Sequence, residues 1–176
     1  MEIRKDSLLY HDFPNCHYID SFEYVIMDKK DKIDVIKIAE RFIQPGPKWF
    51  EGLFALRNKI VSVFNLKTPA TVVREKSAIK NNWEIGTQAG IFKVFGKSAT
   101  EIVLGDDDKH LDVRVSLLLN PYKEKADRKQ VVVTTVVKYN NRLGRIYFFF
   151  VKPFHRTMVP LLLKRNMKQL EADFNK

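Results

Sequence analysis

The chain has little cysteine, little glycine and no long apolar run. It contains one cysteine, Cys16, which forms no internal disulfide and favours a reducing compartment, so we expect a cytoplasmic protein. Its longest apolar runs, RIYFFFV and MVPLLL, are far shorter than the roughly 20 residues that a membrane-spanning helix needs. The N-terminus lacks the apolar core of a signal peptide. No G-x-G-x-x-G motif occurs, and we predict neither a cofactor nor a metal.

Acidic residues are scarce in one quarter of the chain. Residues 121–165 hold eleven Lys and Arg but only Glu124 and Asp127, so almost all of the formal charge of +10 lies there. One interpretation is a solvated basic face that keeps the protein soluble. The other is a surface for nucleic acid or an anionic partner. No RNP sequence occurs, which disfavours RNA.

The length and composition indicate a single folded domain. Hydrophobic residues make up 45% of the 176 residues and include 13 Phe, which excludes a disordered chain. We predict one domain over residues 1–176, in which residues 1–20 form an N-terminal arm.

The first half of the chain predicts one strand and two helices. Alternating apolar residues predict a strand over 21–27. Asp31 is the expected cap of a helix that ends at Ile43, and Pro47 opens a second helix that runs to about Phe64. On a helical wheel Arg57 falls in the middle of the apolar arc of this second helix. Residues 66–90 are expected to be a long connection with one short strand candidate, TVVREK.

The second half predicts strands and then a long helix. Helical spacing of apolar residues predicts a helix over 153–174, with Pro160 either kinking or opening it. Closely joined strands are expected to pair antiparallel. The five strand candidates are IFKVFG, ATEIVLG, HLDVRVSLLL, QVVVTTVVKY and GRIYFFFV.

This order of elements predicts an α+β fold. A meander of about six to seven strands must curl, and the long C-terminal helix with one apolar stripe is expected to lie across the concave side. Two shorter helices follow the first strand. The stripe of the terminal helix consists of Val159, Leu163, Met167, Leu170 and Phe174.

Four separated blocks resemble a known family. They are YIDSFEY, PKWFEGLFALRNKIVSVFNLKTP, EIVLGDDDKHLDVRVSLLL and TTVVKYNNRLGRIYFFFVKPFHRTMV. In this order they resemble the domain-of-unknown-function 2867 family of bacterial proteins, over roughly residues 18–165. The resemblance implies a START-like (SRPBCC) helix-grip fold, in which a curved antiparallel sheet wraps a long C-terminal helix, often around a cavity. It implies no established activity.

The segment LGDDDKHLDVRVSLLL, residues 104–119, has the strongest appearance of a chemical site. Asp106 and Asp108 match the first positions of a calcium loop, but Lys109 and His110 break the pattern and no glycine or glutamate follows in register. We therefore interpret the segment as a hairpin with an acidic tip.

The strand after this tip has one apolar face and one polar face. The polar face carries His110, Asp112, Arg114 and Ser116. One interpretation is that this polar face is exposed to solvent. The other is that one of its carboxylates pairs with Arg57, since a guanidinium on an apolar helix face must reach solvent or a carboxylate. We hypothesise that Arg57 pairs with Asp112, with Glu101 as the second choice.

The leading functional hypothesis is a binding module for a small, mostly apolar or aromatic ligand in a cavity between the sheet and the C-terminal helix. His155, expected at the start of that helix, is kept neutral there by the helix dipole. One alternative is a cyclase-type or hydrolase-type enzyme on a hydrophobic small molecule, and another is a basic module that binds nucleic acid or an acidic partner. The sequence does not indicate an oligomeric state. The expected polar ligand-binding groups are Arg57, Asp112, Arg114, Tyr147 and His155.

Overall fold

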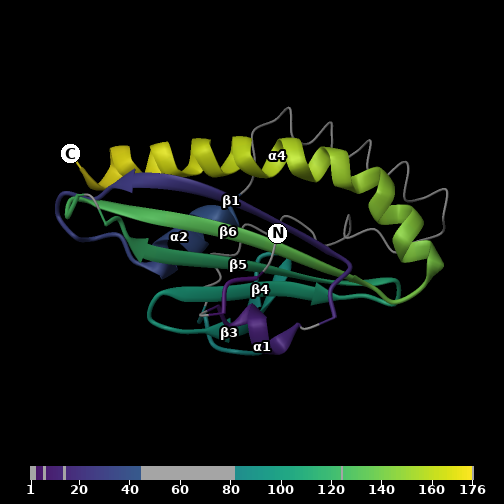
Figure 1. Ribbon diagram of the computed structural model, residues 1–176. Helices are drawn as coiled ribbons and strands as arrows, with labels where there is room; N and C mark the ends of the chain where they lie inside the picture. The colour runs from purple at the N-terminus through teal and green to yellow at the C-terminus, as the bar shows by residue number, and fades with distance from the viewer. Residues whose placement is uncertain (1–2, 6, 14, 45–81, 124, 176) are drawn as a thin grey trace.

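A six-stranded antiparallel sheet forms the centre of the computed structural model, which describes residues 3–5, 7–13, 15–44, 82–123 and 125–175. The strands lie in the order β1-β6-β5-β4-β3-β2, so each pairs with its neighbour in the chain except β1, which pairs with β6 (Figure 1). Their bounds are β1 Tyr18–Met27, β2 Gln88–Ala89, β3 Phe92–Lys97, β4 Glu101–Asp107, β5 Leu111–Pro121 and β6 Arg128–Tyr139. The first strand thus begins within the segment predicted to be an arm.

Three helices accompany the sheet in the described residues: α1 (Leu9–Asp12), α2 (Val35–Phe42) and α4 (Arg142–Phe174). The predicted first helix is confirmed as α2, but Asp31 is not its cap. Asp34 caps it, because its side chain accepts the backbone N–H of Lys37, whereas Asp31 adopts a positive φ of 49° in the preceding turn. The predicted helix over 47–64, the TVVREK candidate and Arg57 lie outside the described residues.

The prediction that residues 144–151 form a strand is wrong. These residues belong to α4, a continuous helix that begins at Arg142 and contains both Pro153 and Pro160. Asn141 starts the helix, because its side chain accepts the backbone N–H of Gly144. Pro160 therefore does not open a separate helix. Figure 1 shows that α4 curves along its length, as prolines inside a helix favour.

The apolar side of the sheet that faces α2 and α4 is called the helix face. Alternate residues of the strands point to it, including Ile26 of β1, Leu117 of β5 and Val133 of β6. The expected stripe of α4 packs here, with Leu163, Met167 and Leu170 buried and Val159 and Phe174 partly buried. The α+β class, with a curved antiparallel sheet packed on a long C-terminal helix, is confirmed.

The opposite side of the sheet is called the arm face, because the N-terminal segment covers part of it. Leu9 and Phe13 are buried there against Val103 of β4 and Val136 of β6. The interpretation of this face as wet is therefore wrong near its middle, where Ser116 is only 2% exposed. The helix face is thus covered by α2 and α4 and part of the arm face by the N-terminal segment, and β1 connects these two layers.

Candidate functional site

The structure does not bring the predicted ligand-binding residues together. Arg57 lies outside the described residues, so its pairing stays a prediction. Asp112 and Arg114 point to the arm face, whereas Tyr147 and His155 belong to α4 over the other side of the sheet. The Asp112 carboxylate accepts a hydrogen bond of 2.7 Å from the side-chain amide of Asn140.

Arg114 is held by local contacts on the arm face. Its guanidinium carbon lies 3.3 Å from the ring centroid of Phe95, and its Nη1 lies 2.6 Å from a carboxylate oxygen of Asp107. Gly105 makes room for it, because a Cβ at this position would lie 2.7 Å from the Arg114 Cδ. A stacked and paired guanidinium of this kind stabilises the hairpin.

Glu101, the second predicted partner of Arg57, is a buried carboxylate on the same face and is 2% exposed. It accepts hydrogen bonds from the hydroxyls of Ser7 and Ser116 and from the backbone N–H of Leu8. These three donors satisfy the charge without a cation from the described residues. Glu101 therefore fixes the N-terminal segment to the sheet.

His155 joins α4 to β1. Its Nε2 lies 3.3 Å from Oδ1 of Asp20, and the Tyr18 hydroxyl donates a 2.5 Å hydrogen bond to Oδ2 of the same carboxylate. Arg156 in turn donates from Nε to the Tyr18 oxygen. The expectation that the helix dipole acts on His155 is wrong, because α4 begins at Arg142, several turns earlier. The side chain is a hydrogen-bonded link between a helix and a strand.

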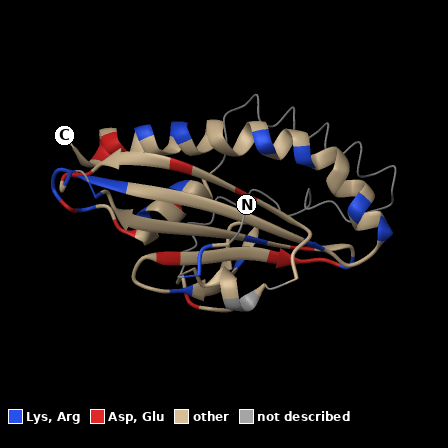
Figure 2. Cartoon of the chain, viewed as in Figure 1, with Lys and Arg blue, Asp and Glu red and all other residues tan. Residues whose placement is uncertain are grey.

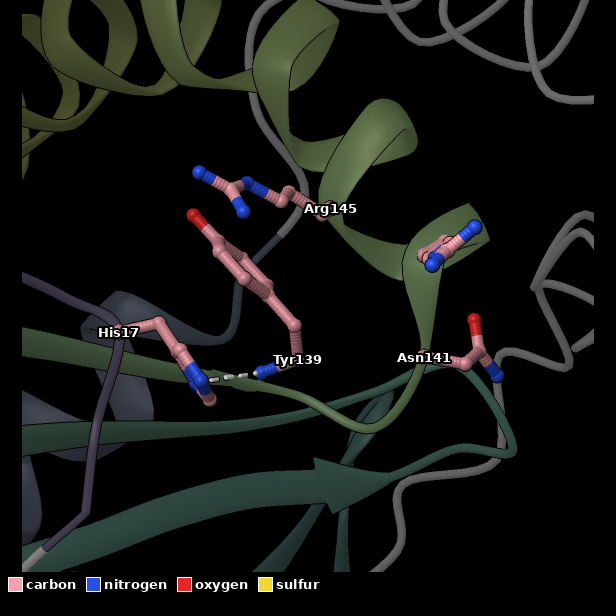
Figure 3. A pocket seen from close by; sticks show the side chains of 5 residues that line it. His17, Tyr139, Asn141 and Arg145 are labelled. Carbon is pink, nitrogen blue, oxygen red and sulfur yellow. Dashed lines mark hydrogen bonds between the residues drawn. The ribbon is translucent and has the colours of Figure 1, made fainter.

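A pocket lies where β6 ends and α4 begins. Its volume is about 340 Å³ and it is open to solvent. Figure 3 shows the Tyr139 ring between His17 and Arg145, with its hydroxyl directed toward the Arg145 guanidinium. The lining residues are His17, Tyr139, Asn141, Arg142 and Arg145.

Two stacked rings form one wall of this terminal pocket. The ring centroids of His17 and Tyr139 are 4.9 Å apart and their planes differ by 20°. The backbone N–H of Tyr139 donates to Nδ1 of His17, so the neutral imidazole carries its proton on Nε2. Burial raises the pKa of the Tyr139 phenol and the Arg145 charge opposes that rise. The wall thus offers an aromatic surface with donor groups at its edges.

The other wall is the first turn of α4, which carries two cations and no acid. Arg142 and Arg145 are exposed, and in the described part of the chain no carboxylate forms an ion pair with either. Cations at a helix N-terminus are disfavoured by the helix dipole. Their charges and the dipole both point toward an anion in this place.

The acidic hairpin tip holds this first turn in position. The Asn140 side chain donates to the carbonyl of Asp108, and the Asn141 side chain donates to the carbonyl of Lys109. Gly144 lies so close to the hairpin that a Cβ would fall 1.9 Å from the His110 carbonyl oxygen. The predicted hairpin is therefore confirmed, and it supports the pocket from outside. Among the described residues, no group of three His, Cys, Asp or Glu is placed to hold a metal ion.

Sequence reasoning missed the pocket because it placed a turn and a strand where the helix begins. The signal was present in NNRLGR: an asparagine cap, a glycine three residues later and two arginines one turn apart. The nearby aromatic run favoured a strand and concealed this pattern.

Comparison with known proteins identifies a family and no close relative. No curated protein and no solved structure matches the chain. No helix of the described residues is long and apolar enough to cross a membrane. The family model that matches is described as Protein of unknown function (DUF2867) and covers residues 13–162. Since that match includes most of the chain, the protein belongs to the DUF2867 family.

Proposed function

We propose that this domain binds a small molecule that combines an aromatic or apolar body with an anionic group, in the terminal pocket. The observation that carries the proposal is that two arginines, which form no ion pair with any described residue, meet two stacked rings in one pocket. A volume of about 340 Å³ lies at the lower end of the range for small-molecule sites, so the ligand is of one or two rings.

Each wall has a distinct role in this proposal. Arg145 and Arg142 bind a carboxylate or phosphate with charge-assisted hydrogen bonds, near the N-terminus of α4. The stacked rings of His17 and Tyr139 provide an apolar surface for the body of the ligand. The Nε2–H of His17 orients a polar substituent.

The proposed ligand lies beside the C-terminal helix, as the sequence predicted, but at the end of the sheet and not between the sheet and the helix. On the helix face, Ile26, Leu117 and Met167 are fully buried and pack in one cluster with their neighbours. The cavity predicted between sheet and helix stays a prediction. The curved sheet and the long helix support a START-like relationship, and the single cysteine supports a reducing, cytoplasmic setting.

Titration calorimetry with aromatic acids tests this function. We expect benzoate, phenylacetate or phenyl phosphate to bind, and benzamide, which lacks the charge, to bind more weakly. Arg145→Gln removes hydrogen bonds to a charged group, each of which contributes about 1.5–3 kcal/mol, so affinity falls roughly tenfold or more.

Arg165→Gln is the matched control, because Arg165 is an exposed arginine on the same helix outside the pocket. It makes the same change of charge and leaves the affinity unchanged. If Arg145→Gln and Arg165→Gln bind the acids equally, or if no acid binds the wild type, the proposal fails.

An enzyme of cyclase or hydrolase type is the second candidate. It needs a titratable group in the pocket, and the His17 imidazole and the Tyr139 phenol both meet this condition. His155 and Asp112 are engaged by Asp20 and Asn140 respectively. Turnover of a bound acid by the wild type and its loss in His17→Gln would favour the enzyme over the binding module.

A further inference from the structure

The N-terminal part of α4 exposes large apolar side chains. Phe149 is 73% exposed, and its helix neighbours Leu143 and Ile146 are each more than 40% exposed. Soluble proteins rarely leave such side chains together in water without a use for them. We call this group the α4 apolar patch; it consists of Leu143, Ile146 and Phe149.

The patch faces away from the sheet. At 100° per residue its three members span an arc of about 120° on the helical wheel. Gly144 and Phe148, which are buried, fall on the opposite side of the helix. This part of α4 therefore has two apolar sides, one packed on the domain and one exposed.

Basic side chains flank the patch. The helix carries seven Lys and Arg, and its only acids, Glu171 and Asp173, lie in its last turn. Figure 2 shows basic residues along the whole of α4 and acidic ones only near the C-terminus. On the wheel Arg145 and Arg156 fall within about 40° of Phe149, just outside the patch, and Arg142 falls within the arc of the patch, between Phe149 and Ile146. In the described residues, neither Arg142 nor Arg145 has an ion-pair partner.

We propose that this part of α4 docks on the surface of an anionic lipid bilayer. The apolar patch enters the boundary between headgroups and acyl chains, and the flanking arginines contact lipid phosphates. Phe149, the most exposed member, inserts deepest. This docking does not depend on the terminal pocket, although Arg142 and Arg145 serve both.

The charges argue against two other occupants of the patch. A symmetric contact with a second copy would bring two strongly basic helices together, and the like charges would repel. Nucleic acid would satisfy the arginines, but phosphate contacts leave the Leu143 and Ile146 side chains in water. A surface that is anionic outside and apolar beneath satisfies both features.

Vesicle sedimentation of the full chain tests the proposal. We expect binding to vesicles of 70% phosphatidylcholine and 30% phosphatidylserine, and little binding to phosphatidylcholine alone. Because salt screens exposed charges, binding decreases as NaCl rises from about 0.1 to 0.5 M. Phe149→Ser removes the deepest apolar side chain and weakens binding about tenfold, whereas Phe149→Trp retains it.

The control is Ile85→Ser, because Ile85 is 68% exposed in a turn before β2, away from α4. It binds vesicles like the wild type. Equal binding of Phe149→Ser and wild type, or no binding of the wild type, overturns the proposal. Retention of the wild type by a single-stranded DNA oligonucleotide, without sedimentation with vesicles, also overturns it and identifies nucleic acid as the partner.

Discussion

The two halves of α4 use apolar residues in opposite ways. Residues 158–174 bury one stripe against the helix face and present Lys164, Arg165 and Lys168 to solvent. Residues 142–157 bury Phe148 and leave Phe149 largely exposed. One helix thus contains a half that stabilises the domain and a half whose side chains are available to ligands and surfaces.

Truncating one apolar side chain in each half of α4 is expected to give the largest difference in stability. Met167 is 1% exposed within the core, so Met167→Ala leaves a cavity and lowers the free energy of unfolding by about 2–5 kcal/mol. Phe149→Ala removes a larger side chain but from solvent, and we expect a change within about 0.5 kcal/mol. Urea denaturation of both variants measures this. Equal losses of unfolding free energy in the two variants would contradict the contrast between a buried and an exposed half of α4.

A substitution at the start of α4 is expected to have the next largest effect. In Gly144→Ala the new Cβ meets the His110 carbonyl, so the first turn must move away from the hairpin. We expect a loss of about 1–3 kcal/mol, although alanine favours a helix. The terminal pocket also loses its geometry, which calorimetry with the aromatic acids detects. Unchanged stability together with unchanged acid binding would contradict the close approach.

The smallest expected effect concerns the contact between β1 and the N-terminal half of α4, where Tyr18 of β1 packs against Phe148. Burial, and then the Asp20 carboxylate, raise the pKa of Tyr18 to about 12. Because the folded pKa exceeds the unfolded value, the neutral phenol stabilises the fold below about pH 10, and this contribution is lost as pH rises toward 12. Tyr18→Phe costs about 1–2 kcal/mol at pH 7.

The measurement is thermal denaturation of wild type and Tyr18→Phe between pH 8 and 11. The difference in stability is expected to be constant up to about pH 10 and then to shrink, as the wild type alone loses the contribution. Other ionising groups are common to both proteins and cancel. A constant difference over the whole range would contradict the raised pKa.

The contrast between the two halves of α4 also explains why only the C-terminal half was predicted correctly from the sequence. Leu163, Met167 and Leu170 recur at helical spacing with charged residues opposite, and this half was predicted as a helix. The run IYFFFV is apolar on every side, so it has no helical period, and its aromatic and β-branched residues favour a strand. Packing of Phe148 against Tyr18 and the cap at Asn141 override that local preference.

The candidate site was less predictable than the fold because it depends on contacts between distant segments. His17 and Tyr139 meet only because β1 pairs with β6, the strand most distant from it in the chain. The polar side chains of β5 alternate in the sequence as predicted, but nothing local indicates that an N-terminal segment covers Arg114. The alternation of residues along a strand determines which side chains share a face of the sheet. The order in which strands pair determines which side chains of distant segments become neighbours.

The tie between the β4–β5 turn and the helix cap has a consequence for relatives of this protein. The side chains of Asn140 and Asn141 donate hydrogen bonds to the carbonyls of Asp108 and Lys109. The length of that turn therefore determines where the first turn of α4 lies relative to the end of the sheet. An inserted or deleted turn residue would shift both arginines relative to the aromatic wall. Under the proposed function, family members would then differ in ligand preference through changes in a turn that does not line the pocket.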